Sequence, residues 1–245
     1  MTKHAFSAVH KDSLSESVYR QLSDKILRRE LSAGDTLPAE RELSEAFGVN
    51  RGAVREAIKR LQQAGLVAVR HGGNHVVLDY LDEGGMELLP SLLVDKQGRL
   101  NGTVVRSIMA MRSSLAPDIA AAAAKKGGKL LADELDALLR QMQVDGKNLK
   151  ALQDHALAFW QKLVAHGGNI AFRLAFNSMT RTYTQVWDVL TPVMEKEFRD
   201  FDNLGALAKA VRKGDAGAAR DAGLRHVEIG RKALERALKS VDLPI

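Results

Sequence analysis

The chain has 245 residues, with 36 Lys and Arg against 30 Asp and Glu, a formal net charge of +6, and it contains no cysteine. The length suits two domains of ordinary size, and the missing cysteine excludes disulfides, thiolate zinc sites, iron–sulfur clusters and a cysteine nucleophile. Every apolar run is shorter than the roughly 18–20 residues that span a bilayer, and the N-terminus lacks the apolar core of a signal peptide, so we expect a cytoplasmic protein with no membrane partner.

Residues 1–12 are expected to form a flexible leader and residues 13–78 the first domain. Its first helix is predicted from apolar residues at four-residue steps, Val18, Leu22 and Ile26. The second helix is expected to begin at Pro38, because the first helical residue needs no N–H, and to end at Gly48. Asn50 suits the N-cap of a third helix, which starts at Arg51 and stops at Gly65.

A β-hairpin is predicted after the third helix. Two β-prone runs, Leu66–Val69 and His75–Leu78, flank the turn residues Gly72 and Gly73. Three short helices, a tight turn at Gly48 between the second and the third, and a terminal hairpin are typical of a winged helix-turn-helix. A generic small helical subdomain is the plainer alternative.

Positive charge is concentrated in residues 51–75. The segment holds five basic side chains against Glu56, which is 5 − 1 = +4. The five are Arg51, Arg55, Lys59, Arg60 and Arg70. Such a local stripe is the electrostatic footprint of a DNA reader, although a solvated basic face would look the same.

Residues 79–101 are predicted to be a linker with a short helix, and residues 102–245 a second, all-helical domain. Helices are expected at about 102–125 (interrupted at Pro117), 129–143, 148–166, 169–190, 194–212 and 215–241. The predicted fold class is therefore mostly α: an N-terminal winged helix-turn-helix with a small hairpin wing and a C-terminal helical bundle. A bundle of this kind can hold a ligand between its helices.

The stretch TLPAERELSEAFGVNRGAVREAIKRLQQAGLVAVRHGGNHVV resembles the DNA-binding domain of the GntR family of bacterial transcription regulators, over about residues 13–78. The resemblance rests on the LPAER box at 37–41, the RxxVREAIxRLxxxGL helix and a basic wing, which reads HGGN at 71–74 where the family has an HGxG-like pattern. It implies DNA contacts from Arg41, Arg51 and Arg55. It also implies a wing in the minor groove, with Arg70, His71 and Gly72 at its tip.

The residues themselves favour the same docking. The N-terminal end of a recognition helix touches base edges in the major groove, and here that end is Asn50, Arg51, Gly52, Ala53 and Arg55. An arginine fork suits guanine, and the small residues allow close approach. Surface salt bridges, for example with Glu42 or Glu45, are the alternative for the arginines. One domain offers too small an interface for tight binding, so we expect a homodimer on a palindromic double-stranded DNA operator.

The helical half resembles the effector-binding and dimerisation domain of the FadR subfamily, through the segments VVRSIMAMRSSLAPDIAAAAA, FWQKLVAHGGN, NSMTRTYTQVW and AVRKGDAGAARDAGLRH. Many members of that subfamily hold a divalent metal with one aspartate and three histidines. In this chain Ala156, Trp160 and Leu204 stand at three of those positions, and His226 alone is retained. Neither a bound metal nor another cofactor is expected.

Apolar replacements at these positions favour an apolar ligand. In this respect the chain is similar to the metal-free, fatty-acid-responsive branch, which binds long-chain acyl-CoA. The residues expected to bind the effector are Arg112, Trp160, Tyr183, Trp187 and His226. Plain core roles are the alternative for the aromatic residues, and His226 is either a polar contact in the pocket or a satisfied core histidine.

The expected function is a DNA-binding transcription regulator whose DNA affinity shifts when a small acidic effector, such as an organic acid or a fatty acyl-CoA, binds the helical domain. A metal-dependent sensor of small carboxylates is the alternative within this class, and a structural DNA-bending protein is the alternative outside it. An enzyme is disfavoured, because the chain lacks nucleotide-binding glycine motifs and the GxSxG and HExxH signatures.

Overall fold

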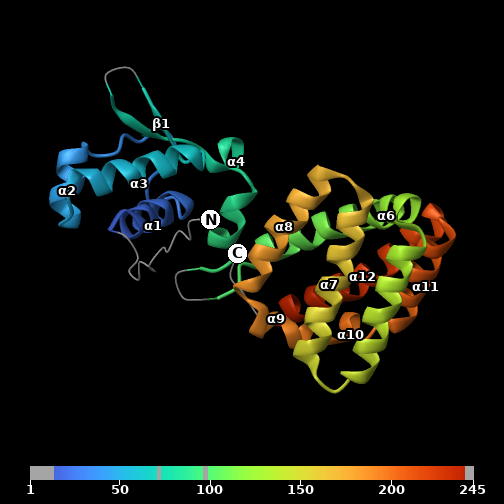
Figure 1. The fold of residues 1–245 in the computed structure, drawn as a ribbon. Coiled ribbons are helices and arrows are strands. Elements are labelled where there is room, and N and C mark those ends of the chain that lie inside the picture. Colours follow the sequence, from blue (N-terminus) through green and yellow to red (C-terminus); the bar gives the residue numbers. More distant parts are fainter. Residues whose placement is uncertain (1–13, 71–72, 96–98, 241–245) are drawn as a thin grey trace, which may run out of the picture. The chain divides into compact units, whose positions relative to one another are not determined.

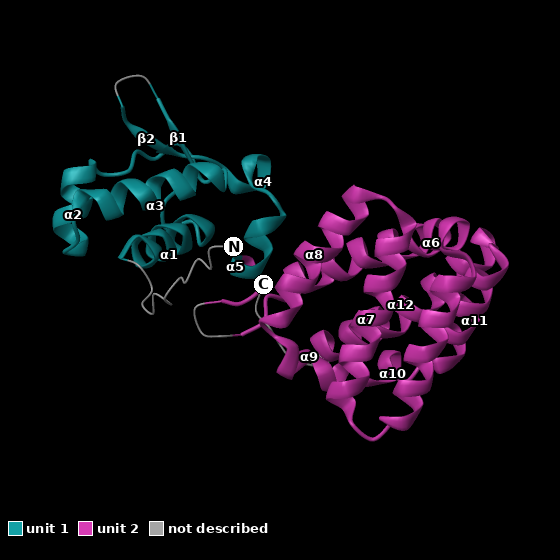
Figure 2. Ribbon diagram, in the orientation of Figure 1, with its two compact units in different colours: residues 1–91 teal, residues 92–245 magenta. Residues whose placement is uncertain are grey.

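The computed structural model describes residues 14–70, 73–95 and 99–240. The chain divides into two compact units, residues 1–91 and residues 92–245 (Figure 2). No helix within the described ranges is long and apolar enough to cross a membrane. The leader expected at residues 1–12 lies outside the described residues.

The first unit is a winged helix-turn-helix, as predicted. Helices α1 (Leu14–Leu27), α2 (Glu40–Phe47) and α3 (Arg51–Gln63) precede the antiparallel strands β1 (Val67–Val69) and β2 (His75–Val77) (Figure 1). Helices α1 and α3 pack together, and their facing sides supply the core. The buried residues are Val18, Leu22 and Ile26 from α1 and Val54, Ile58 and Leu61 from α3.

Helix α2 begins later than the expected Pro38. Its N-cap is Ala39, whose amide donates to the Glu42 carboxylate at 3.2 Å. The residues before it belong to the wing instead, because Leu37 N donates to the His75 carbonyl at 2.8 Å and Thr36 forms an isolated bridge with Val76. A backbone committed to a strand partner cannot also be the first turn of a helix.

The hairpin is attached closely to the end of α3. Gly65 follows the helix with φ of 68°, in the left-handed region that glycine adopts without strain. A Cβ at Gly65 would lie 2.2 Å from the Glu83 carbonyl oxygen. This close approach brings the end of α3 against the backbone of the segment that follows the hairpin.

The segment expected to be a linker holds three short helical turns. They are α4 (Tyr80–Glu83), a 3₁₀ turn η1 (Met86–Leu88) and α5 (Leu89–Leu92). Asp79 caps α4 through the Leu81 amide, and Asn101 caps the following long helix.

The second unit is entirely helical in its described residues. It comprises α6 (Gly102–Val144), α7 (Leu149–Gly167), α8 (Ile170–Thr184), α9 (Trp187–Val193), α10 (Glu195–Phe198), α11 (Phe201–Lys213) and α12 (Ala216–Ser240) (Figure 1). Helix α6 packs against α7, α11 and α12 and is the centre of the bundle. The expected all-α second half is confirmed.

Some predicted helix breaks are wrong. Pro117 lies inside α6 without interrupting it, and Pro117 and much of the alanine run after it are buried in the bundle. The expected break at Gly127-Gly128 is confirmed, because Gly128 has a non-helical φ of 55° and ψ of −153°, so α6 is two helices joined by a kink at that residue. The single helices expected over 169–190 and 194–212 are each divided in two, and Asp200 caps the second part of the latter.

Candidate functional site

The turn between α2 and α3 is fixed by local hydrogen bonds. Gly48 adopts a left-handed conformation with φ of 63°, and the Ser44 hydroxyl donates to the Val49 carbonyl at 2.5 Å. Asn50 caps α3 as expected, its Oδ1 accepting from the Ala53 amide at 2.9 Å. These contacts leave the first turn of α3 at the surface of the unit.

The three arginines expected to contact DNA are all exposed but differ in their partners. Arg55 Nη2 lies 3.1 Å from the Glu40 carboxylate, and this hydrogen bond raises the pKa of Arg55. The partner is thus Glu40, and not the Glu42 or Glu45 considered from the sequence. Among the described residues Arg41 and Arg51 have no ion pair or side-chain hydrogen bond.

The rest of the basic stripe is largely engaged within the domain. Lys59 pairs with Glu56 at 3.0 Å, whereas Arg60 pairs with Glu16 and lies 4.3 Å from the centre of the Tyr19 ring. Arg60 therefore ties α3 to α1. Three of the five basic side chains in residues 51–75 are therefore paired with acidic residues of the same domain.

The remaining predicted DNA contacts lie around the start of α3 and in the wing. Gly52 is exposed, and a Cβ there would lie 3.1 Å from Asn50 Oδ1. Ala53 is half-buried, and Arg70, directly after β1, is exposed. His71 and Gly72 lie outside the described residues.

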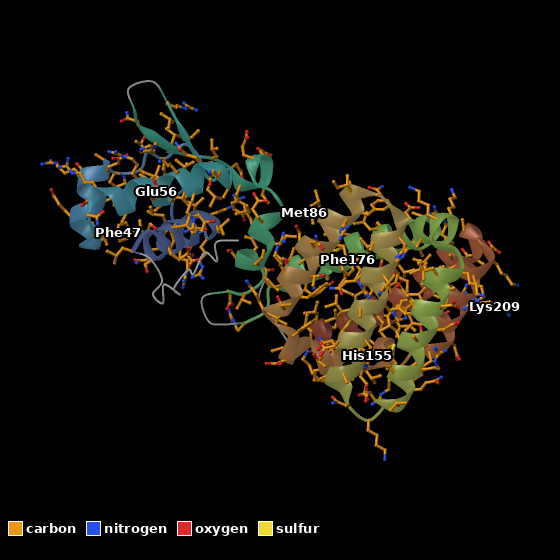
Figure 3. The ribbon with its side chains drawn as sticks, in the orientation of Figure 1. Phe47, Glu56, Met86, His155, Phe176 and Lys209 are labelled. Atoms are coloured by element: carbon orange, nitrogen blue, oxygen red, sulfur yellow. The ribbon has the colours of Figure 1, made fainter. Side chains whose placement is uncertain are left out.

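The second unit contains a cavity of about 110 Å³ between its helices. Its lining is mostly apolar and comes from α6, α7, α8, α9, α10 and α12; Phe176 of α8, labelled in Figure 3, is one of these side chains. The apolar lining residues include Leu115, Ile119, Leu157, Phe176, Met179, Leu190, Met194, Phe198 and Leu234. The cavity is suited to a hydrophobic ligand.

Four of the five predicted effector residues meet at this cavity. Arg112, Trp160, Tyr183 and Trp187 line it from four different helices. The fifth, His226, is fully buried and does not line it, but its ring stacks on Trp160 with the centroids 6.1 Å apart. Distant parts of the sequence thus converge on one place.

A buried ion pair lies at the cavity. Arg112 donates to both carboxylate oxygens of Glu197, one of them at 2.8 Å. The Glu197 side chain is 2% exposed and that of Arg112 17%. Burial alone would lower the pKa of Arg112, but the adjacent Glu197 carboxylate raises it above its usual value. The guanidinium is therefore charged and already neutralised by its partner.

Tyr183 adds a neutral polar group beside this pair. Its hydroxyl donates to the Met109 sulfur at 3.0 Å, and burial raises the pKa of Tyr183 to about 12. The phenol is consequently un-ionised at neutral pH.

His226 connects the ion pair to a second carboxylate. Its Nδ1 lies 3.0 Å from Asp200 Oδ2, and its Nε2 lies 3.7 Å from Glu197 Oε1 without forming a hydrogen bond. Burial would raise the pKa of Asp200, but hydrogen bonds from His226 and Asn203 outweigh it and hold that pKa below its usual value. Asp200 is therefore an ionised hydrogen-bond acceptor.

Sequence reasoning missed Glu197 and Asp200. Both stand in the charged run EKEFRDFDN, which looks like a solvated helix face, and their burial follows only from how α10 and α11 fold under α12. Gly230 of α12 makes room for one of them, because a Cβ there would lie 2.0 Å from Glu197 Oε2. No local pattern marks that glycine.

The residues present do not suit the divalent metal of related domains. Ala156, Trp160 and Leu204, which stand where the resemblance places ligands, are buried and offer no carboxylate or imidazole. Within the described ranges no three His, Asp or Glu side chains are arranged to hold a metal ion.

Family profiles match both halves of the chain. The profile described as "Bacterial regulatory proteins, gntR family" matches residues 14–77. The profile described as "FCD domain" matches residues 107–229, about half of the chain. Each match falls within one of the two compact units.

Relatives with similar length are described as regulators. The chain is 36% identical over 236 residues to "HTH-type transcriptional regulator Mce2R" of Mycobacterium tuberculosis, covering 96% of this chain and 98% of that one. It is 27% identical over 169 residues to "Fatty acid metabolism regulator protein" of Edwardsiella ictaluri, covering 67% of each. Among solved structures, the Listeria monocytogenes protein Lar, described as controlling the expression of the agr system, superposes with a TM-score of 0.56 at 18% identity, over 95% of this chain and 99% of that one.

Proposed function

The chain belongs to the gntR family of bacterial regulatory proteins and carries an FCD domain, and from that premise we propose that it binds a palindromic DNA operator as a homodimer and that an acyl ligand in the second unit changes its DNA affinity. It is a transcription regulator and not an enzyme. The ligand class is a fatty acid or its coenzyme A thioester. The observation that carries the proposal is the apolar cavity with its buried arginine.

The DNA-binding half of the proposal is supported by the start of α3. An α-helix fits the major groove, and an arginine near its N-terminus can donate to both acceptors of guanine. Arg51 is exposed there and, within the described residues, has no acidic partner; Arg41 of α2 is similar. We assign Arg51 to a base edge and Arg41 to a phosphate or a guanine. Arg55 would contact the DNA as well, after its ion pair with Glu40 breaks.

The proposed homodimer is supported by the small area of DNA that one winged helix-turn-helix can contact. A single winged helix reaches a few base pairs, whereas specific affinity and the competition from non-specific sites require more contacts. Two copies on a two-fold axis read two half-sites of a palindrome. We therefore expect two-fold symmetry in the operator.

The acyl ligand is supported by the cavity's chemistry. Its lining is mostly hydrocarbon, and its two charged residues are Arg112 and Glu197, of which the arginine suits an acid's head group. The relatives described as fatty acid metabolism regulators are consistent with this class. A ligand changes DNA affinity only by the difference in its affinity for the two arrangements of the protein.

A selection experiment tests both halves together. The full chain is used to enrich duplexes from a randomised pool, and the enriched duplex is then titrated with protein by fluorescence anisotropy, with and without decanoate or decanoyl-CoA. We expect an enriched palindrome and an acyl-dependent change in affinity. Replacing the cavity-lining Ala156 with Leu should abolish the acyl response and retain DNA binding. An enriched duplex whose affinity no acyl compound changes would refute the effector assignment.

A further inference from the structure

Two residues that line the cavity each bury a polar atom without a hydrogen bond. Gln153 is 3% exposed and Trp160 is 6% exposed, and both belong to the cavity wall. Within the described residues, Gln153 Oε1 and Trp160 Nε1 have no hydrogen-bond partner. A buried polar atom of this kind costs free energy until a partner reaches it. A ligand in the cavity can supply both partners.

The other strongly polar groups of the cavity are already engaged. Arg112 donates to both carboxylate oxygens of Glu197, and the Tyr183 hydroxyl donates to the Met109 sulfur. A ligand that bonds to one of these groups must compete with a contact that exists. At Gln153 and Trp160 it gains a hydrogen bond without breaking one within the chain.

The two atoms are separated along one face of α7. Gln153 and Trp160 lie seven residues apart, which is about two turns and roughly 10 Å along the helix axis. Ala156 and Leu157 line the cavity between them. This row is polar at its two ends and apolar in the middle. Its complement is a hydrocarbon chain with an oxygen function at each end.

The Trp160 end of the row lies beside the charged pair. The Trp160 ring stacks on His226, and His226 Nε2 lies 3.7 Å from Glu197 Oε1, on the carboxylate that binds Arg112. Trp160 Nε1 can only donate. The acyl oxygen of a fatty acid, or of its thioester, is an acceptor that suits it. The Gln153 end then meets the far part of the acyl chain.

We propose that the cavity selects an acyl ligand with a hydroxyl group remote from its head group, so that the hydroxyl bonds to the amide of Gln153 and the acyl oxygen accepts from Trp160 Nε1. The proposal rests on the acyl-responsive function above and adds the polar group by which one acyl ligand is distinguished from others. No covalent bond changes, and Gln153 is the residue that determines the specificity.

A hydroxyl is the group that fits the Gln153 end. It both donates and accepts, so it pairs with the amide in either orientation of its oxygen and nitrogen. A ketone or an ether only accepts and cannot serve Gln153 Oε1. An ammonium group or a second carboxylate would be a buried charge, and the charges of the cavity, Arg112 and Glu197, are already paired with each other.

The test is calorimetric titration of the full chain with three acids of equal chain length. They are ω-hydroxydecanoate, decanoate and β-hydroxydecanoate, whose hydroxyl stands next to the head group. We expect ω-hydroxydecanoate to bind about tenfold more tightly than decanoate, the effect of one added hydrogen bond to a buried group. The β isomer should bind no more tightly than decanoate, because its hydroxyl does not reach Gln153.

Variants separate the two ends of the row. Gln153→Met keeps the length of the side chain and removes the amide, so it should bind ω-hydroxydecanoate and decanoate with equal affinity. The matched Gln161→Met changes an exposed glutamine of the same helix that does not line the cavity, and it should retain the tenfold preference. Trp160→Phe should weaken both acids by a similar factor and leave their ratio unchanged.

Each outcome decides a different point. Equal affinity of the unaltered chain for decanoate and ω-hydroxydecanoate overturns the inference, as does a preference for the β isomer, and neither result depends on whether the variants fold. A preference that persists in Gln153→Met also overturns it. Binding of decanoate with a change in DNA affinity would then leave the proposed function intact. If no acyl compound binds or alters DNA affinity, the proposed effector class itself is wrong.

Discussion

The guanidinium of Arg55 lies 3.1 Å from the carboxylate of Glu40, so α2 and α3 are joined by an ion pair on the face assigned to DNA. Phosphate oxygens compete for the same guanidinium. The pair holds Arg55 in place when DNA is absent and must give way, at least in part, when a duplex binds. Arg51, four residues earlier on α3, has no such competitor among the described residues.

Arg51→Ala should therefore weaken operator binding by about 1–3 kcal/mol and relax the base preference at one position of each half-site. Anisotropy titrations with the selected duplex and with single-base variants measure both effects. Lys59→Ala is the control, because Lys59 is paired with Glu56 further along α3. Equal affinity of the Arg51 variant and the unaltered protein would contradict the docking.

Glu40→Gln should strengthen DNA binding and steepen its dependence on salt. The change frees Arg55 for a phosphate and removes a negative charge from the interface, and each neutralised phosphate adds to the slope of affinity against salt concentration. The measurement is affinity for one duplex over a range of salt concentrations. A slope no steeper than that of the unaltered chain would show that Arg55 stays away from DNA.

Arg112→Met should lower the free energy of unfolding by about 3–5 kcal/mol, since it leaves the carboxylate of Glu197, 2% exposed, buried without its partner. Replacing both residues, Arg112→Met with Glu197→Leu, should recover most of that loss, because no unpaired charge remains. Urea unfolding of the single and double variants gives the comparison. A double variant no more stable than the single one would mean that the pair is not the source of the loss.

Asp200 should make stability depend on pH at the acid end. Its pKa is lowered on folding, so the ionised group contributes stability that is present above the ordinary value of 3.8 and is lost as the pH falls through the lower value of the folded state. Asp200→Asn removes this contribution. The difference in unfolding free energy between the two proteins should therefore shrink as the pH falls below about 4. A difference that stays constant over that range would rule out Asp200 as its source.

Gly230→Ala should disturb the ion pair from the opposite side. The new Cβ would lie 2.0 Å from Glu197 Oε2, so either the carboxylate leaves Arg112 or α12 shifts, at a cost of about 1–3 kcal/mol. Gly217→Ala in the first turns of the same helix is the matched control, since its Cβ would meet nothing nearer than Asp215 Oδ1 at 3.5 Å. There alanine should be neutral or stabilising. Thermal unfolding of both variants provides the measurement.

The order and class of the elements could be predicted from the sequence because local chemistry determines them. Asn50 caps α3, and Gly48 adopts the left-handed conformation of the turn. Asparagine is a preferred N-cap residue and glycine is the residue that adopts positive φ most easily, so both roles could be predicted from the residue type. The start of α2 could not be predicted, because Leu37 donates to His75, a partner nearly forty residues away. Helix ends that depend on tertiary hydrogen bonds have no local signal.

The candidate site was predictable only in part. Arg112, Trp160, Tyr183 and Trp187 were identified by resemblance, and the structure brings them to one cavity. The carboxylates of Glu197, which lines that cavity, and of Asp200, which bonds His226, look like surface residues in the sequence. Whether an acid is buried depends on which side of α10 and α11 faces α12, and the short helix α10 has too few residues for a periodic pattern to show it.

Helix α6 begins at Gly102, immediately after the segment that joins the two units, and reaches Arg112 after ten further residues, a rise of about 15 Å. Asn101 fixes its first turn by accepting from the amides of Thr103 and Val104. Because a helix is stiff along its axis, a tilt of α6 about Arg112 would displace Asn101 further than it displaces the residues next to the arginine. A spin label or fluorophore at the exposed Arg106, which lies between Asn101 and Arg112 in the sequence, would detect such a tilt if ligand binding causes one.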